Sequence, residues 1–443
     1  MESKENELIN SKMNHALLKF ALPFMFASFL QAVYGAVDLF VVGQYANSAA
    51  VSAVSIGSQL MQLATVLITG LSMGGTVEIG VRIGEQNIPG VCRAIGNLII
   101  VFLVMTVVLT PAMLLGTGLL VDIMQTPVEA VPDCRTYMRI CSAGLPFIVG
   151  YNAISGIYRG TGDSRTPVLF IGIATIINIV LDFALTGGLG MGAAGAAIAT
   201  ITAQGVSFLC AVIHMMKGGF HYPIQREHFR PKGQIIGRIL KVGFPLALQD
   251  VLVHFSFLAI SAIINTLGLI ASAAVGIAEK LMGFAFIIPG SFGGAVATAV
   301  AQNIGAGNID RTKQAHRWGI LYSGICGIIV CILCFTIPKT LVGLFSRDAA
   351  VIASGATYIG TYSIDCILTA FVFCTNGYLN GNGKSVVCFA HSMAATFLVR
   401  IPVTWGMSLI VTDSLAPMGL AAPAASLLSI IICLIYMRHM EKD

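Results

Sequence analysis

The amino-acid sequence predicts an all-α integral membrane protein, with twelve transmembrane helices in two six-helix lobes around a central cavity. Three observations predict this fold class: an apolar composition, twelve long apolar segments whose flanking charges alternate between two sides, and an internal repeat. Of the 443 residues, 56% are hydrophobic and 10% are charged, whereas soluble domains carry about 25% charged residues. So few charges cannot cover a soluble protein of this length, and most of the surface is therefore expected to face lipid.

Twelve segments are long enough to cross a bilayer, because each spanning helix needs about 20 mainly apolar residues. Turn sequences separate them, such as Gly160-Thr-Gly-Asp163 and Gly305-Ala-Gly-Asn308. The predicted spans are 17–42, 51–77, 94–118, 136–158, 167–186, 192–216, 239–267, 271–301, 318–337, 353–378, 385–411 and 415–437.

The basic residues predict the orientation of these spans. With a cytoplasmic N-terminus, 19 of the 25 basic residues lie at or beyond the cytoplasmic ends of the spans, two lie deep inside spans and four lie at or beyond the outer ends. The four outer residues are Arg135, Arg139, Lys339 and Arg347. Cytoplasmic loops of membrane proteins carry an excess of Lys and Arg. The sequence thus predicts a multi-pass protein of the plasma membrane with both termini in the cytoplasm, and residues 1–14 do not resemble a removable signal peptide.

The two halves of the chain resemble one another at a nearly constant offset along the sequence. Gly156-Ile-Tyr-Arg-Gly-Thr-Gly-Asp-Ser164 reappears as Gly377-Tyr-Leu-Asn-Gly-Asn-Gly-Lys-Ser385. Pro23 matches Pro245 at almost the same offset. We therefore predict an N-lobe of residues 1–216 with helices 1–6, a basic cytoplasmic linker of residues 217–238, and a C-lobe of residues 239–443 with helices 7–12.

This architecture favours a secondary transporter. Six spans per repeat give both halves the same orientation, and two such halves around a central site are typical of alternating access. The sequence contains no segment that resembles a selectivity filter, no ATP-hydrolysing domain and no catalytic motif, so we expect neither a channel nor an enzyme. An ion gradient is the expected energy source, with no cofactor, and no basic stripe suggests nucleic-acid binding.

Four polar residues of the N-terminal half are the strongest candidate site. A charge inside a bilayer is costly, so Asp38 and Asp182 are functional candidates, and both lie near the outer ends of their helices. Asn178 lies one turn before Asp182, and Thr200 is placed at a comparable depth. Oxygen ligands of this kind suit a hard cation such as Na⁺, while the two carboxylates could instead carry a proton. The alternative is that all four residues only form hydrogen bonds between helices.

The C-terminal half offers a second set of polar candidates for the cavity or for a further ion site. Asp365 and Arg400 both lie near mid-span, where they could form a structural ion pair or take part in transport. Glu279 could line the cavity, and Asp250 and His254 lie one turn apart on the seventh helix. A lone histidine within a membrane is more often a packing residue than a proton carrier, although its titration range allows either role.

Five motifs are spread over nearly the whole chain. They are Pro23 with Tyr34-Gly-Ala-Val-Asp-Leu-Phe-Val-Val-Gly43, Gly156-Ile-Tyr-Arg-Gly-Thr-Gly-Asp-Ser-Arg-Thr-Pro167, Asn178-Ile-Val-Leu-Asp182, Gly192-Ala-Ala-Gly-Ala-Ala-Ile-Ala-Thr200 and Ala301-Gln-Asn-Ile-Gly-Ala-Gly-Asn308. Together these motifs resemble the multidrug and toxic compound extrusion transporters. The resemblance implies export of small amphipathic organic cations in exchange for Na⁺ or H⁺. It also implies that the cation site of the N-lobe consists of Asp38, Asn178, Asp182 and Thr200.

A lipid-linked saccharide flippase of a related fold is the main alternative. Such a protein needs several basic side chains in its cavity to hold a pyrophosphate group. Only Lys280 and Arg400 lie deep inside the predicted spans, which disfavours this interpretation. We expect the protein to function as a monomer in the lipid bilayer.

Overall fold

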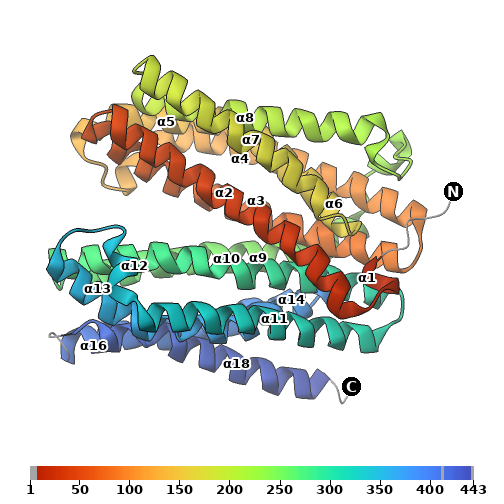
Figure 1. Ribbon diagram of the computed structural model, residues 1–443. Helices are drawn as coiled ribbons and strands as arrows, with labels where there is room; N and C mark the ends of the chain where they lie inside the picture. The colour runs from red at the N-terminus through yellow and green to blue at the C-terminus, as the bar shows by residue number, and fades with distance from the viewer. Residues whose placement is uncertain (1–6, 411–413, 441–443) are drawn as a thin grey trace. The chain divides into compact units, whose positions relative to one another are not determined.

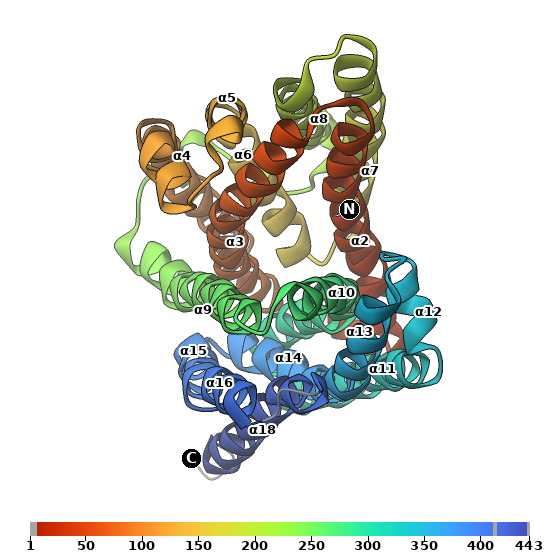
Figure 2. The same cartoon turned by 90° about the vertical axis from the view of Figure 1, so that its left-hand side faces the viewer.

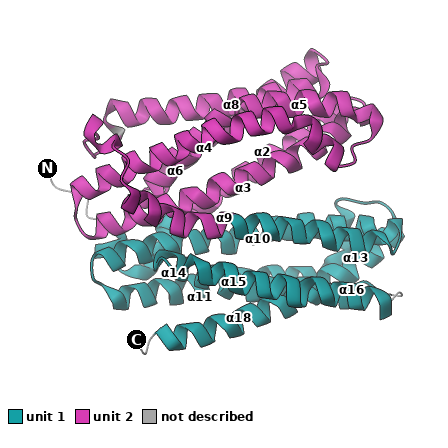
Figure 3. Ribbon diagram, turned by 180° about the vertical axis from the view of Figure 1, so that it is seen from behind, with its two compact units in different colours: residues 1–21, 248–443 teal, residues 22–247 magenta. Residues whose placement is uncertain are grey.

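The computed structural model describes residues 7–410 and 414–440, and the chain in these ranges forms helices without strands (Figure 1). The chain divides into two compact units. Unit 1 comprises Met1–Ala21 and Leu248–Asp443, and unit 2 comprises Leu22–Ala247 (Figure 3). The unit boundaries therefore fall inside two helices, whereas the sequence placed the division in the loop 217–238. The assignment of functional lobes to sequence ranges stays a prediction.

Unit 2 consists of six spans and part of a seventh. It contains most of α2 (Met13–Tyr45) and the first half of α9 (Gly233–Asn265). Its other helices are α3 (Ser48–Gly84), α4 (Ile88–Ile123), α5 (Val131–Ala143), α6 (Leu145–Gly160), α7 (Arg165–Asp182), α8 (Gly192–His214), and the short turns η1 (Val128–Ala130), η2 (Phe183–Gly188), η3 (Met215–Gly219) and η4 (Arg226–Phe229). Within this unit α3 packs against α4, α5 and α6, as Figure 2 shows.

Unit 1 combines the first helices of the chain with its C-terminal half. Its elements are α1 (Glu7–Asn10), the start of α2, the second half of α9, α10 (Leu269–Gly305), α11 (Ile309–Thr336), α12 (Pro338–Gly343), α13 (Ala349–Tyr362), α14 (Asp365–Gly381), α15 (Ser385–Ala395), η5 (Thr396–Arg400), α16 (Ile401–Ile410), α17 (Ala416–Gly419) and α18 (Ala421–Met440). Here α14 packs against α10 and α11 (Figure 2).

The helix count agrees with the predicted fold class. Among the described residues, ten helices are long and apolar enough to cross a membrane, and two bent helix pairs pass the same test when each pair is taken together. The all-α, twelve-helix membrane fold is thereby confirmed. Asparagine and aspartate side chains start several of these helices: Asn47 accepts a hydrogen bond from the amide of Ala50 at 2.8 Å, and Asp348 accepts one from the amide of Ala350 at 2.8 Å.

Two predicted spans are bent at equivalent places of the repeat. The pair formed by Val128–Ala143 and α6 bends by 46° at Gly144, and the pair formed by α13 and α14 bends by 44° next to Asp365. Gly144 and Asp365 are matched positions, separated by the same offset as Gly156 and Gly377. Pro146 follows the first bend, and its ring has no amide hydrogen to continue the preceding helix. Asp365 is therefore the first residue of a new helix and not a mid-helix residue.

Matched positions of the repeat also form equivalent helix crossings inside the two units. A Cβ atom at Gly156 on α6 would collide with Ser72 on α3, and a Cβ atom at Gly377 on α14 would collide with the carbonyl of Gly293 on α10. Ser72 and Gly293 are separated by the same offset as Gly156 and Gly377. Each unit thus contains the same close backbone crossing, which only a glycine permits.

The long helices α2 and α9 each contribute to both units. The boundary in α2 lies between Ala21 and Leu22, next to Pro23, and the boundary in α9 follows Ala247, two residues after Pro245. A proline inside a helix removes one backbone hydrogen bond and weakens the helix locally. The matched prolines thus mark the places where each helix leaves one compact unit for the other.

Candidate functional site

Three helices of unit 2 bring the four N-terminal candidates together. The hydroxyl of Thr200 on α8 donates a hydrogen bond of 2.9 Å to Oδ2 of Asp38 on α2. One turn before Asp38, the hydroxyl of Tyr34 donates to the backbone carbonyl of Thr200 at 2.9 Å. These two bonds join α2 to α8 at a single level. Tyr34 was not among the residues that the sequence analysis selected, although its spacing from Asp38 places both on one helix face.

Asp182 and Asn178 complete this group from the end of α7. Both side chains are fully buried, and both lie close to the carboxyl group of Asp38. A π-helical turn, Phe183–Gly188, follows Asp182 directly. Turns of this type occur often at functional sites, because they re-aim the side chains of a helix. We refer to Asp38, Asn178, Asp182 and Thr200 as the Asp38 cluster; the structure brings together all four residues.

Several buried polar atoms of the Asp38 cluster have no hydrogen-bond partner. They are Oδ1 of Asp38, both carboxylate oxygens of Asp182, and both polar atoms of the Asn178 carboxamide. Buried polar atoms are normally satisfied, so a set of them in one place indicates a ligand site. Carboxylate, amide and hydroxyl oxygens are also the donors that a hard cation prefers. The residues therefore fit a bound Na⁺ ion or a bound proton.

The charges of the Asp38 cluster also favour a bound cation or proton. Among the described residues, no lysine or arginine forms an ion pair with Asp38 or Asp182. Two adjacent buried carboxylates without a positive partner are costly when both are ionised. A shared proton or cation removes that cost, so the charge state of the pair and the binding of a cation are coupled.

The C-terminal candidates form a second group around Arg400, at the end of the π-helical turn η5. Its Nη2 donates to the Tyr362 hydroxyl at 3.1 Å, and its guanidinium lies over the Phe257 ring at 4.1 Å from the centroid. Asp365 and Glu279 lie within electrostatic range of Arg400. The ion pair considered for Asp365 and Arg400 is not formed among the described residues, because Tyr362 and Phe257 hold the guanidinium instead.

Asp365 itself is buried, and its Oδ1 atom has no hydrogen-bond partner. Its carboxyl group interacts with Ser426 on α18. Asp250 and His254 on α9 make no side-chain hydrogen bond or ion pair with the part of the chain that the structure describes. Asp250 and His254 thus stay candidates on sequence grounds alone. No group of three or more His, Cys, Asp or Glu residues suited to a metal ion occurs in the described ranges.

The structure contains one buried ionic group that the sequence did not predict. Glu78, on α3, is only 5% exposed. It accepts hydrogen bonds from Nε of Arg82 at 3.0 Å and from Nε of Arg238 on α9 at 3.0 Å. The predicted span 51–77 ends one residue before Glu78, so the sequence places this carboxylate outside the membrane-spanning segment. The spacing of Glu78 and Arg82 by four residues was the signal available for an ion pair on one helix.

Both halves of the chain match a known protein family. The family model MatE matches the chain twice, over residues 23–184 and 245–405. The chain belongs to the multidrug and toxic compound extrusion (MATE) family. The two matches begin at the matched prolines, Pro23 and Pro245, so the MATE family model confirms the internal repeat. The first match also contains Asp38, Asn178 and Asp182.

Individual relatives agree with this assignment. The chain is 26% identical over 389 residues to "Probable multidrug resistance protein YpnP" of Bacillus subtilis, covering 88% of this chain and 87% of that protein. It is 27% identical over 397 residues to "Probable multidrug resistance protein NorM" of Thermotoga maritima, covering 88% and 85%. The fold matches a solved structure described as the outward-facing conformation of a multidrug resistance MATE family transporter, with a TM-score of 0.93, 22% identity, and coverage of 99% and 98%.

Membership of the MATE family makes the chain a multi-pass membrane transporter. The flippase alternative is not favoured, because the family model and the relatives point to MATE transporters.

Proposed function

We propose that this MATE transporter exports small amphipathic organic cations and that an inward flow of Na⁺ or H⁺ through the Asp38 cluster drives the export. The observation that carries the proposal is the pair of adjacent buried carboxylates, Asp38 and Asp182, without a basic partner among the described residues. The names of the relatives, which describe multidrug resistance proteins, support the substrate class.

The coupling follows from the electrostatics of the Asp38 cluster. When the site is empty, the two carboxylates carry negative charge in a medium of low dielectric constant, so the site attracts a cation or a proton. Binding of one cation or proton reduces the negative charge of the pair by one and lowers the cost of closing the helices around it. Alternating access then exposes the occupied site to the cytoplasm, where the ion leaves. A conformational change that only one charge state permits is what links ion entry to substrate exit.

Each residue of the Asp38 cluster has a distinct role in this proposal. Asp38 and Asp182 take up the ion, and Asn178 supplies an uncharged oxygen. Thr200 orients the Asp38 carboxylate through its 2.9 Å hydrogen bond. A proton needs only the two carboxylates, whereas Na⁺ needs several oxygen ligands at once, so removal of the Asn178 carboxamide oxygen should impair only Na⁺ coupling.

The experiment that tests the proposal is transport into proteoliposomes under separately imposed Na⁺ and pH gradients, with a fluorescent organic cation as the substrate. We expect one of the two gradients to drive transport by the natural protein, and Asp38→Asn and Asp182→Asn to abolish the gradient-driven part. Asp122→Asn is the matched control, because Asp122 is 65% exposed and pairs with exposed Arg135. Full gradient-driven transport by Asp38→Asn would overturn the proposal.

We further propose that both termini lie in the cytoplasm of a plasma-membrane protein that works as a monomer. The distribution of the basic residues supports this orientation. Accessibility of single cysteines placed at positions 10 and 440 to a membrane-impermeant reagent, in a background without the other cysteines, tests it in intact cells. Labelling at either position before the cells are opened would contradict it.

A further inference from the structure

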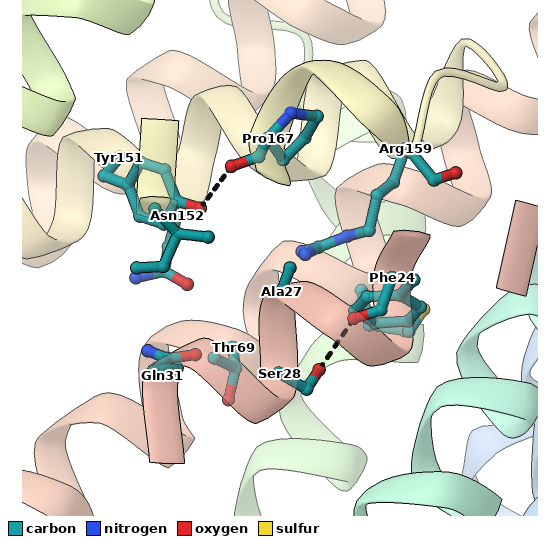
Figure 4. Close-up of a pocket in the computed structure, with 12 residues that line it drawn as sticks. Phe24, Ala27, Ser28, Gln31, Thr69, Tyr151, Asn152, Arg159 and Pro167 are labelled. Atoms are coloured by element: carbon teal, nitrogen blue, oxygen red, sulfur yellow. Dashed lines mark hydrogen bonds between the residues drawn. The ribbon is translucent and has the colours of Figure 1, made fainter. Parts of the chain in front are cut away.

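Unit 2 contains a cavity of about 200 Å³ that none of the Asp38 cluster residues line. Its walls come from α2, α3, α6 and α7, and all of its lining residues belong to unit 2 (Figure 4). One part of the wall is apolar and includes Phe24, Met73 and Ile171. The polar part includes Gln31 and Arg159. We call this space the Arg159 cavity.

Arg159 is the only lysine or arginine among the residues that line this cavity. It belongs to the last turn of α6, and its guanidinium points into the cavity, as Figure 4 shows. Its Nη2 donates to the hydroxyl of Ser72 at 3.1 Å, and its Cζ lies 5.1 Å from the centroid of the Phe24 ring. Its buried Nε has no hydrogen-bond partner. One hydroxyl and one ring therefore hold a guanidinium that can donate five hydrogen bonds.

No carboxylate neutralises Arg159 within the part of the chain that the structure describes. Two acidic residues on or next to the adjoining elements are held by other groups. Asp163, in the turn after α6, accepts hydrogen bonds from the amides of Arg165 at 2.9 Å and Thr166 at 3.0 Å. Glu78, further along α3, is held by Arg82 and Arg238. The positive charge of Arg159 is consequently available to a ligand.

The size and walls of the Arg159 cavity restrict that ligand. Sites for drug-sized molecules have volumes of about 300–1,000 Å³, so a cavity of about 200 Å³ suits a headgroup with a short apolar part. The planar guanidinium matches the geometry of carboxylate and phosphate oxygens, and hydrogen bonds between such charged groups are among the strongest in proteins. The apolar part of the wall lowers the local polarity and so strengthens that attraction.

We propose that the Arg159 cavity binds the acidic headgroup of an amphiphile, a carboxylate or a phosphate, with Arg159 as the anion-binding residue. Gln31 supplies a second donor from α2, and the first carbons of the apolar chain lie against Phe24 and Met73. This site goes beyond the export of cations by the Asp38 cluster, because it takes the opposite charge and uses different residues. Membrane lipids with phosphate headgroups and free acidic amphiphiles share this chemistry.

The test is binding by the purified full-length protein in an uncharged detergent. Dodecyl phosphate is the probe, and the thermal unfolding midpoint is followed as its concentration rises. We expect a saturable rise for the natural protein. Arg159→Gln should weaken binding about tenfold or more, because a charge-assisted hydrogen bond is lost. Arg165→Gln is the control, because Arg165 is exposed and lies outside the cavity. Equal binding by the natural protein and Arg159→Gln would overturn the proposal.

Two further variants keep the proposal testable if Arg159→Gln does not fold. Arg159→Lys keeps the positive charge and should bind with an affinity between those of the natural protein and Arg159→Gln. Gln31→Leu changes an exposed residue and should weaken binding a few-fold. Dodecyltrimethylammonium, which has the same chain and the opposite charge, should not compete. Competition by this cation as strong as that by dodecyl phosphate would contradict an anion site.

Two competitors distinguish a membrane lipid from a free acidic amphiphile as the ligand. If phosphatidylglycerol in nanodiscs displaces dodecyl phosphate from the natural protein, the site takes a lipid headgroup. If decanoate displaces it while phosphatidylglycerol does not, the site takes a free acidic amphiphile. Both outcomes support the proposal, and displacement by neither overturns it. The experiment measures binding and not transport. Its outcome is therefore independent of the coupling role proposed for Asp38.

Discussion

The hydroxyl of Thr200 on α8 donates a 2.9 Å hydrogen bond to Oδ2 of Asp38 on α2, and the two residues are 162 positions apart in the chain. The bond leaves Oδ1 of Asp38 buried and without a partner. One oxygen of the carboxylate is thus fixed by the protein while the other is available to an ion. This division of roles within one carboxyl group leads to the first prediction.

Thr200→Val should impair transport while preserving the fold. Valine has nearly the same shape as threonine but lacks the hydroxyl, so Oδ2 of Asp38 loses its donor. A hydrogen bond to a charged group contributes about 1.5–3 kcal/mol, so gradient-driven transport should fall about tenfold or more. Initial rates in proteoliposomes provide the measurement. Thr200→Ser retains the hydroxyl and should stay within about threefold of the natural protein; a loss as large as that of Thr200→Val would reject this role for the hydroxyl.

Glu78→Gln should destabilise unit 2. The substitution removes the carboxylate that holds Arg82 on α3 and Arg238 on α9. Arg238 is 46% exposed and can recover its hydration, so we expect a loss of about 1–3 kcal/mol and a lower thermal unfolding midpoint in detergent.

Glu85→Gln is the matched control for Glu78. Its carboxylate also pairs with Arg82, but it is 35% exposed, and solvent-exposed ion pairs contribute at most about 1 kcal/mol. If the two variants had the same unfolding midpoint, burial of Glu78 would not explain its contribution.

Gly377→Ala should destabilise the crossing of α14 and α10. The added methyl group would collide with the carbonyl oxygen of Gly293, a backbone atom that cannot rotate away. Overpacking of this kind costs about 1–3 kcal/mol. Gly276→Ala on α10 is the control, because a methyl group there meets no atom within 4 Å. Thermal unfolding of both variants compares them, and a Gly276→Ala variant that is less stable than Gly377→Ala would contradict the close crossing.

Arg311→Ala should release the N-terminal segment from unit 1. The guanidinium of Arg311 donates to the carbonyls of Leu8 and Ser11, at 3.1 and 2.6 Å, and to the Asn303 carboxamide at 3.0 Å. Without these bonds, amide hydrogen exchange in α1 and at the start of α2 should become faster. Arg317→Ala, at an exposed position of the same helix, should leave exchange there unchanged. Unaltered exchange in Arg311→Ala would show that packing alone holds the segment.

The sequence by itself determined the number of spans, the repeat and the residues of the Asp38 cluster. These features depend on local composition and spacing: apolar length defines a span, and a buried carboxylate in an apolar segment is conspicuous. The constant offset of the repeat also connected Gly156 with Gly377, which the structure places at equivalent crossings.

Only the tertiary structure decided which distant side chains meet. It showed that α13 and α14 break next to Asp365, that Tyr362 and Phe257 hold Arg400, and that Arg159 faces a cavity and not a loop. Such contacts arise when helices far apart in the chain pack together, and each depends on the exact approach of both partners. Hydropathy and spacing along one chain carry no information about that approach, which is why these contacts emerged from the fold alone.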